Sequence, residues 1–161
     1  MTLRGVALLC TLAAGLALGL ALASERWGGQ VPCALCLWER WPYRVAIVLG
    51  LLAAVTPPRI ARAMLLLVAL SMLASVALAV VHVGVEQRYW PSPLPECAAP
   101  TLAGGSIAER LAQMPARPAK PCDDPTYLLP ALPVSMALMN LLYALGFAGV
   151  LSLVIVRRRP A

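Results

Sequence analysis

The stretch Pro32–Val55 reads PCALCLWERWPYRVAIVLGLLAAV and joins a C-x-x-C motif directly to an apolar segment. Its continuously apolar part begins only at Val45, which is too short for a bilayer crossing that needs about 20 apolar residues. A crossing helix must therefore also include the charged stretch before Val45, and we predict a span at Leu37–Val55. The two cysteines of the motif would then lie at the mouth of this span, at headgroup depth.

Three further segments are apolar and long enough to cross a bilayer. They cover Leu3–Ala23, Ala63–Val85 and Val134–Val156. The chain has 161 residues, of which 61% are hydrophobic and only 12% are charged, whereas about 25% of residues are charged in soluble domains. We therefore predict one all-α integral membrane domain over residues 1–161, built as a four-transmembrane-helix bundle.

The distribution of charge predicts the orientation of the bundle. All 7 acidic residues lie in or beside two loops, at about 24–36 and 86–133, where basic residues balance them. The rest of the chain carries only basic residues, namely Arg4, Arg59, Arg62, Arg157, Arg158 and Arg159. By the positive-inside rule both termini are cytoplasmic and the two loops lie outside, where disulfides persist. The net charge of +6 is then a signal of topology, and we expect no binding of nucleic acid.

The N-terminal segment has a second interpretation. Arg4, an apolar run and the sequence Ala21-Leu22-Ala23 are also typical of a secretory signal peptide with its cleavage site. The run of about 19 residues is longer than the usual apolar region of 7–15 in such peptides. Gly15 and Gly19 form a face of small residues suited to helix packing in lipid. We therefore expect a retained helix.

The long loop at 86–133 holds ten of the 15 prolines, so it should contain little regular structure. One exception is a capping box formed by Ser106 and Glu109. Apolar residues then recur at helical spacing, at Ile107, Leu111 and Met114. We predict a short interfacial helix on the outer membrane surface, between two arms that are free to move.

Each arm of this loop carries a cysteine, Cys97 before the short helix and Cys122 after it. A disulfide between them could be a structural staple that contributes about 3 kcal/mol by restricting the unfolded chain. The arms, however, are rich in proline and have few apolar anchors, which predicts an exposed disulfide, and exposed disulfides exchange readily. The spacing alone leaves both alternatives open.

Cys33 and Cys36 form the close pair. If the helix begins near Ala34, Cys36 lies in its first turn, where unpaired amides and the helix dipole stabilise a thiolate. Arg40 lies four residues further along the same face, where its cation would favour a charged sulfur and an anionic electron acceptor. Arg40 could instead only extend to the interface.

A zinc site is the main alternative for the four cysteines, because Cys33, Cys36, Cys97 and Cys122 could form a Cys₄ set. The wide spacing of the second pair and the lack of a nearby histidine argue against it, and we expect no metal. A purely structural C-x-x-C closes so small a loop that it would stabilise little.

Four other features have simple interpretations. Cys10, within the first span, should behave as a small hydrophobic residue. His82, the only histidine, lies toward the outer end of the third span and is more typical of a packed residue than of a cofactor contact. Asn140 should form a hydrogen bond between helices. The aromatic residues near the outer loops should form an interfacial belt: Trp27, Trp38, Trp41, Tyr43, Tyr89, Trp90 and Tyr127.

The order of these motifs resembles the disulfide bond formation protein B (DsbB) family. Pro32–Arg40 reads P-C-x-L-C-x-x-E-R, the run Trp90-Pro91-Ser92-Pro93 precedes Cys97, and Ser135-Met136-Ala137 with Asn140 opens the last span. The resemblance implies a quinone-dependent thiol oxidase of the bacterial inner membrane. Its electrons would come from a periplasmic DsbA-like thiol oxidase and pass to ubiquinone or menaquinone.

The same resemblance implies a role for each cysteine. The partner would attack Cys97 of a Cys97–Cys122 disulfide, and the released Cys122 would attack Cys33 of a Cys33–Cys36 disulfide. Cys36, beside Arg40, would then pass electrons to the quinone. His82 is a candidate quinone contact, although its spacing to the Trp90 run differs from that of the histidine found in some members. Glu39 and Arg44 have no role here beyond interface charge.

Two other functions remain open. The vitamin K epoxide reductase family also combines a small helical membrane protein with two cysteine pairs and a quinone, but its C-x-x-C belongs late in the chain. A non-enzymatic helical subunit with structural or metal-binding cysteines is the other alternative.

Overall fold

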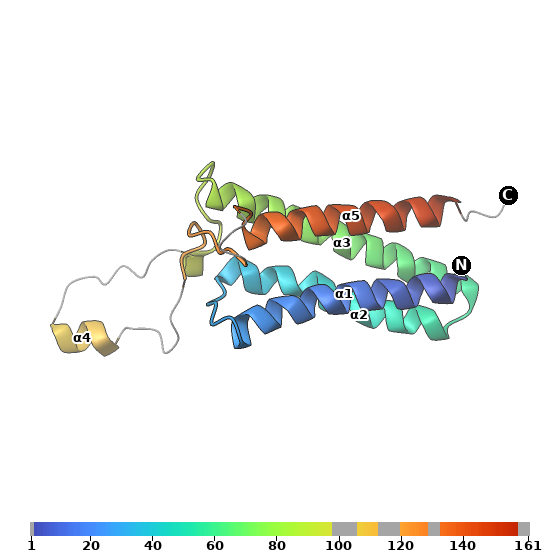
Figure 1. Ribbon diagram of the computed structural model, residues 1–161, viewed down its shortest axis with the longest axis horizontal. Coiled ribbons are helices and arrows are strands. Elements are labelled where there is room, and N and C mark those ends of the chain that lie inside the picture. The colour runs from blue at the N-terminus through green and yellow to red at the C-terminus, as the bar shows by residue number, and fades with distance from the viewer. Residues whose placement is uncertain (1, 98–105, 113–119, 129–132, 158–161) are drawn as a thin grey trace.

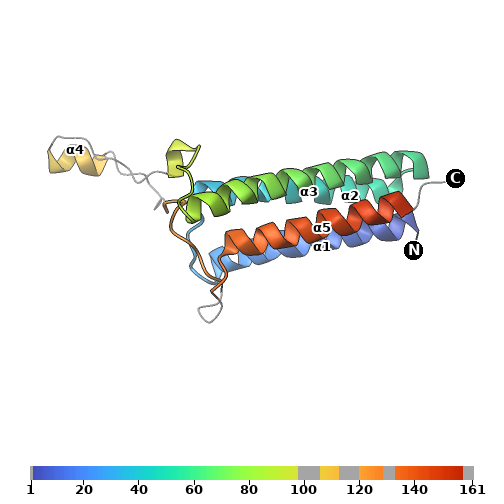
Figure 2. The ribbon, with the colours of Figure 1, turned by 90° about the horizontal axis from the view of Figure 1, so that it is seen from above.

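The computed structural model describes residues 2–97, 106–112, 120–128 and 133–157. Four long helices form an elongated bundle: α1 (Leu3–Arg26), α2 (Ala34–Val55), α3 (Pro58–Glu86) and α5 (Met136–Arg157), as Figures 1 and 2 show. The long loop contributes a short 3₁₀ helix, η1 (Pro95–Cys97), and α4 (Ile107–Ala112). The described residues contain isolated β-bridges but no strand, so the predicted all-α class is confirmed for them.

Helices α1, α3 and α5 are long and apolar enough to cross a membrane. Helix α2 is equally regular, but its first half carries three charged residues and it does not belong to that group. The fourth crossing therefore stays a prediction. A stripe along the outer side of α1 is more than half exposed at every position, at Leu8, Leu12, Leu16 and Leu20. So continuous an apolar surface needs lipid or another apolar cover.

Small residues allow α1 and α2 to approach closely. Ala7 and Ala14 on α1 are fully buried, and a side chain at Gly50 of α2 would overlap the hydroxyl of Thr11. Gly15 and Gly19 have nothing within 4 Å of where a Cβ would be. The expectation that these two glycines make the helix contact is therefore wrong, because the face of α1 that packs on α2 carries other small residues.

Helix α2 packs on both α1 and α3, and α3 packs on α5. In Figure 2, α1 and α5 also run side by side. A hydrogen bond joins them about halfway along, where the Tyr143 hydroxyl donates to the carbonyl of Ala13 at 2.9 Å. The helix order leaves a seam between α1 and α5, and this seam contains the cavities described below.

The helix ends differ from the predicted spans for local reasons. Helix α2 begins at Ala34, as the motif analysis expected, rather than at Leu37. Helix α3 begins at Pro58 rather than Ala63, since proline fits the first helical position. Helix α5 begins at Met136 rather than Val134, because the Ser135 hydroxyl accepts the Leu138 N–H at 3.2 Å as a cap.

The chain reverses direction sharply after α3. Arg88 adopts a positive φ of 59°, and the Tyr89 N–H donates to the Gly84 carbonyl at 2.9 Å. The indole of Trp90 then lies against Gly84, where any side chain would overlap it, and donates to the Val81 carbonyl at 3.1 Å. This turn folds the following segment back over the end of α3 and leads into η1.

The predicted capping box is present at the start of α4. The Ser106 hydroxyl accepts the Glu109 N–H at 3.3 Å, and the Glu109 carboxylate accepts the Ser106 N–H at 2.8 Å. The helix ends at Ala112. Met114 lies outside the described residues, and the position of α4 on the membrane surface stays a prediction.

Candidate functional site

The long loop is closed by a disulfide between Cys97 and Cys122. Both cysteines are buried, with 4% and 1% of their surface exposed. They belong to one apolar cluster with Cys33, Val85 and Leu35, against which Leu94 also packs. The expectation of an exposed disulfide is therefore wrong.

The arm that carries Cys122 is held by polar contacts. Lys120 pairs with Cys33 in a parallel β-bridge. The Lys120 ammonium donates to the Thr126 hydroxyl at 2.7 Å, and the Gln30 amide donates to the Tyr127 carbonyl at 2.8 Å. These contacts are made by backbone and polar groups, so the small number of apolar residues in the arm did not indicate them. The arm therefore lies against the first loop. Our expectation that it is free to move is wrong.

Cys33 and Cys36 lie at the start of α2 and are not bonded to each other. Cys33 is the N-cap, and its sulfur accepts the Cys36 N–H at 3.2 Å. The two sulfurs are 2.7 Å apart. The hydrogen bond from the Cys36 thiol lowers the pKa of Cys33, and the helix N–H acts in the same direction. The sequence argument placed the thiolate on Cys36, whereas the geometry favours Cys33.

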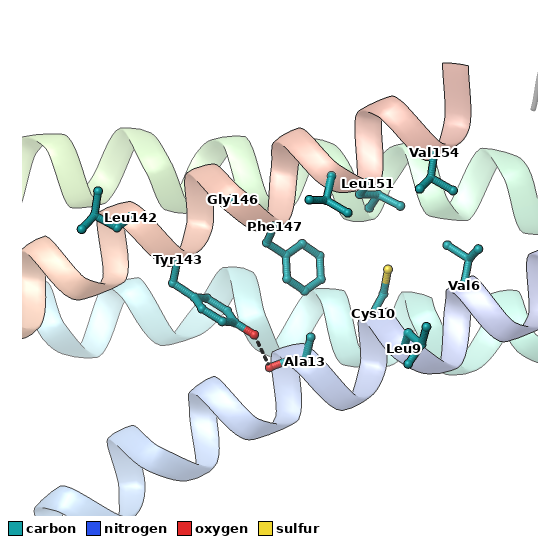
Figure 3. Close-up of a pocket in the computed structure, with 11 residues that line it drawn as sticks. Val6, Leu9, Cys10, Ala13, Leu142, Tyr143, Gly146, Phe147, Leu151 and Val154 are labelled. Atoms are coloured by element: carbon teal, nitrogen blue, oxygen red, sulfur yellow. Dashed lines mark hydrogen bonds between the residues drawn. The ribbon is translucent and has the colours of Figure 1, made fainter. Parts of the chain in front are cut away.

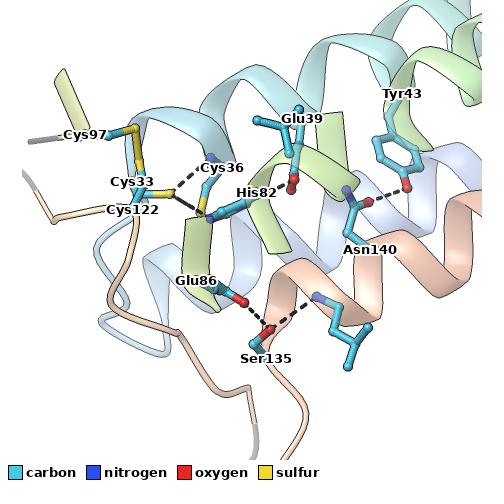
Figure 4. A network of polar contacts seen from close by, with 12 residues as sticks. Cys33, Cys36, Glu39, Tyr43, His82, Glu86, Cys97, Cys122, Ser135 and Asn140 are labelled. Carbon is cyan, nitrogen blue, oxygen red and sulfur yellow. Dashed lines mark hydrogen bonds and ion pairs between the residues drawn. A yellow bond between two sulfur atoms is a disulfide. The ribbon is translucent and has the colours of Figure 1, made fainter. Parts of the chain in front are cut away.

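A buried histidine lies beside this pair, as Figure 4 shows. His82 Nε2 is 3.4 Å from the Cys33 sulfur, and His82 Nδ1 is 3.0 Å from a carboxylate oxygen of Glu39. The argument that no histidine is near the cysteines is wrong, and Glu39 gains a contact that the sequence did not indicate. His82 lies 49 residues from Cys33 and 43 residues from Glu39 in the chain, and only the packing of α3 on α2 brings it to them.

Arg40 is buried and forms an ion pair with Glu25 at the end of α1, with an N–O distance of 2.8 Å. The alternative that Arg40 only extends to the interface is therefore wrong. Its Nε has no hydrogen-bond partner among the residues that the structure describes. Arg44, by contrast, lies over the ring of Trp41 at 5.0 Å from the ring centroid.

A cavity of about 400 Å³ lies between α1, α2 and α5. Cys36 and Arg40 line it, together with Glu39, Tyr43 and Asn140 and many apolar side chains. The Tyr43 hydroxyl donates to the Asn140 carbonyl oxygen at 2.6 Å, which confirms the predicted hydrogen bond between helices. Tyr43 is buried, so its assignment to the interfacial belt is wrong.

The polar groups of this cavity are incompletely paired. Asn140 Nδ2 is buried without a partner, like Arg40 Nε. Such groups are costly to bury and mark a place where a polar ligand atom could be accepted. His82 is not among the described residues that line this cavity. The described structure therefore places His82 beside the cysteine pair and Arg40 beside the cavity.

A second cavity of about 500 Å³ lies further along the α1–α5 seam, as Figure 3 shows. Its lining is apolar apart from the Tyr143 hydroxyl and includes Cys10 and Phe147. Cys10 is buried in the hydrophobic core, as expected for a small hydrophobic residue. No other cysteine in the described part of the chain lines this cavity, so it lies away from both cysteine pairs.

A comparison with protein families finds one that accounts for nearly the whole chain. The family model described as disulfide bond formation protein DsbB matches residues 3–154. No curated protein and no solved structure matches the chain significantly.

Proposed function

Because this chain belongs to the disulfide bond formation protein DsbB family, we propose that it is a quinone-dependent thiol oxidase. It would oxidise the dithiol of a soluble DsbA-like protein and pass the electrons to ubiquinone or menaquinone in the membrane. In this proposal all four long helices cross a bacterial inner membrane, with both termini in the cytoplasm. In support, α1 begins and α5 ends at the end of the bundle opposite the start of α2, where Cys33 and Cys36 lie (Figure 1).

One observation carries the proposal: the Cys33–Cys36 pair lies between the loop disulfide and the cavity that Arg40 and Asn140 line. Cys33 packs in the same cluster as Cys97 and Cys122, whereas Cys36 lines the cavity. Electrons that enter at the loop can therefore leave at the cavity through one close pair of sulfurs. Disulfides with a purely structural role would not need the Cys33–Cys36 pair to lie between the loop disulfide and the cavity.

The first step would be a thiol–disulfide exchange at the loop. A thiolate of the reduced partner attacks the sulfur of Cys97, the Cys97–Cys122 bond breaks, and Cys122 leaves as a thiolate. The second thiolate of the partner then attacks its own mixed disulfide and releases Cys97. The partner leaves with a disulfide, and the loop pair has gained two electrons. Since Cys97 is buried, the loop must open for this attack.

The second step would transfer these electrons to the inner pair. The Cys122 thiolate attacks Cys33 of an oxidised Cys33–Cys36 pair, and Cys36 leaves as a thiolate. Cys97 then attacks Cys122 and restores the loop disulfide, which releases Cys33. The pair is now reduced, with Cys33 positioned by the N–H of Cys36 and near His82. Re-formation of the Cys33–Cys36 bond would release two electrons and two protons, which a quinone bound in the cavity would accept.

The cavity fits a quinone. A quinone accepts two electrons and two protons and carries carbonyl oxygens on an apolar ring, so it needs hydrogen-bond donors within apolar walls. Arg40 Nε and Asn140 Nδ2 are the unpaired donors, and Leu16, Leu20 and Met139 contribute apolar lining. The Glu25 carboxylate would hold Arg40 in place.

The test is quinone reduction by the purified protein, given a reduced DsbA-like partner. We expect quinone to be consumed one for one with partner dithiol. Cys97→Ala should abolish this turnover, and Cys10→Ser, which replaces a cysteine remote from both pairs, is the matched control. Full turnover by a folded Cys36→Ser variant would refute this electron relay, from the loop pair through the Cys33–Cys36 pair to the quinone, and would favour cysteines with a structural role.

A further inference from the structure

The relay leaves one buried polar unit without a role, the pair of His82 and Glu39. Both side chains are buried, with 2% and 7% of their surface exposed. The Glu39 carboxylate holds the Nδ1 side of the imidazole at 3.0 Å, and Nε2 faces the Cys33 sulfur at 3.4 Å. A carboxylate behind a histidine whose other nitrogen faces thiols is the arrangement that surrounds many bound zinc ions.

We propose that the reduced Cys33–Cys36 pair and His82 form a binding site for Zn²⁺. The two sulfurs and one imidazole nitrogen all lie within 4.8 Å of one another. Tetrahedral zinc holds its thiolate sulfurs at about 2.3 Å, which places them about 3.8 Å apart. The sulfurs now lie at 2.7 Å, so binding needs them to separate by about 1 Å.

The fourth coordination position would face the cavity. Of the three proposed ligands, Cys36 lines the cavity, whereas Cys33 and His82 are buried and are not among the described residues that line it. A water molecule or another small donor could therefore complete the tetrahedron from the cavity. Three protein ligands with one open position are typical of zinc sites that exchange a ligand.

The charges also fit. Because Zn²⁺ would replace two thiol protons, binding adds no net charge to this buried region, and a buried net charge is costly. The two thiol protons would leave on binding, and the Glu39 carboxylate would increase the basicity of the imidazole. The Cys33–Cys36 disulfide offers no thiolate, so only the reduced pair can bind.

Because only the reduced pair binds zinc, the metal would also affect turnover, a consequence that rests on the proposed function. Zinc would occupy the sulfur lone pairs that the relay uses and would hold the inner pair reduced. Oxidation of the partner would then stop, and removal of the metal by a chelator would restore it.

The binding test uses a Cys97→Ala/Cys122→Ala variant of the full chain, in detergent, reduced and freed of reductant. Titration with Zn²⁺ against a chromogenic chelator gives affinity and stoichiometry, and Co²⁺ gives a thiolate charge-transfer band as a spectroscopic signature. We expect one metal per chain with release of about two protons. Adding Cys10→Ser should change nothing, because Cys10 lies in the other cavity.

Variants of the proposed ligands decide the outcome. Adding Cys36→Ser should abolish the cobalt band, His82→Ala should alter the band and weaken binding, and Glu39→Gln should weaken binding about 10- to 100-fold. If His82→Ala leaves both the cobalt spectrum and the affinity unchanged, the proposed site is wrong. It is also wrong if the protein binds no metal although a thiol reagent shows that Cys33 and Cys36 are both reduced. None of these measurements uses partner or quinone, so failure of the oxidase proposal would leave them intact. Reversible inhibition of turnover by Zn²⁺ is the separate activity test.

Discussion

The hydrogen bond from the Cys36 thiol makes the largest contribution to the lowered pKa of Cys33, and replacing this donor tests that contribution. The Cys36 thiol lies 2.7 Å from the Cys33 sulfur, while the Cys36 N–H at 3.2 Å would remain in any variant. Burial of Cys33 acts in the opposite direction and disfavours the thiolate. Cys36→Ala should therefore raise the pKa of Cys33, because the side-chain donor is lost and the burial stays.

The size of the effect follows from the strength of the lost contact. A hydrogen bond to a charged acceptor contributes about 1.5–3 kcal/mol, and about 1.4 kcal/mol corresponds to a tenfold change. At a pH below both pKa values, the thiolate fraction of Cys33 should fall about 10- to 100-fold. Since the thiolate is the nucleophile, alkylation should slow by the same factor.

The assay is the rate of Cys33 alkylation by iodoacetamide as a function of pH, in a chain that also carries Cys10→Ser, Cys97→Ala and Cys122→Ala. Cys33 is then the only thiol, and Cys36→Ser is the matched control because its hydroxyl can still donate. We expect the alanine variant to need a higher pH than the serine variant for the same rate. Identical pH profiles for the two variants would show that the side-chain hydrogen bond does not set the acidity of Cys33.

Three further predictions concern the parts around the cysteines. Gly84→Leu should displace the Trp90 ring, cost about 1–3 kcal/mol through overpacking, and make the loop disulfide easier to reduce, as measured by thiol release in dithiothreitol. Unchanged reduction would show that this turn does not hold the loop. Arg40→Met should raise the KM for quinone about tenfold, the loss of about 1.4 kcal/mol of binding, more than it lowers kcat. A KM equal to that of the unchanged protein would remove Arg40 from the quinone site. Tyr43→Phe should lower the free energy of unfolding by about 0.6–1.7 kcal/mol, the range for hydrogen bonds between membrane helices, in a denaturant titration, whereas no loss would mean that its bond to Asn140 contributes nothing.

The sequence was sufficient for the features that depend on local patterns. The apolar runs predicted four helices near their observed positions, and the start of α2 at Ala34 agrees with the condition under which Cys36 lies in the first turn. The capping box at Ser106 and the hydrogen bond of Asn140 also follow from residue type and local context. Each of these needs only neighbours in the chain or the general rule that buried polar groups find a partner.

The features that were missed depend on contacts between distant segments. His82 and Glu39 lie on different helices, and nothing in either local sequence indicates that they meet. The segment that leads to the loop disulfide turns at Arg88, which has a positive φ, and Trp90 packs against Gly84. A left-handed arginine is uncommon, since glycine usually takes that conformation, so nothing in the residue types predicts this turn.

The seam between α1 and α5 also determines how a lipid-soluble substrate would reach the cysteines. Leu16, Leu20 and Met139 line the cavity and are themselves exposed on the outer surface of the bundle. A ligand could therefore arrive sideways, by two-dimensional diffusion within the bilayer, without passing through water. Its effective concentration would be its mole fraction among the lipids. The turnover rate should therefore saturate with the amount of quinone per lipid rather than with the amount per volume of buffer. Diluting proteoliposomes would then leave the rate of each vesicle unchanged, while adding plain lipid to the same vesicles would slow it.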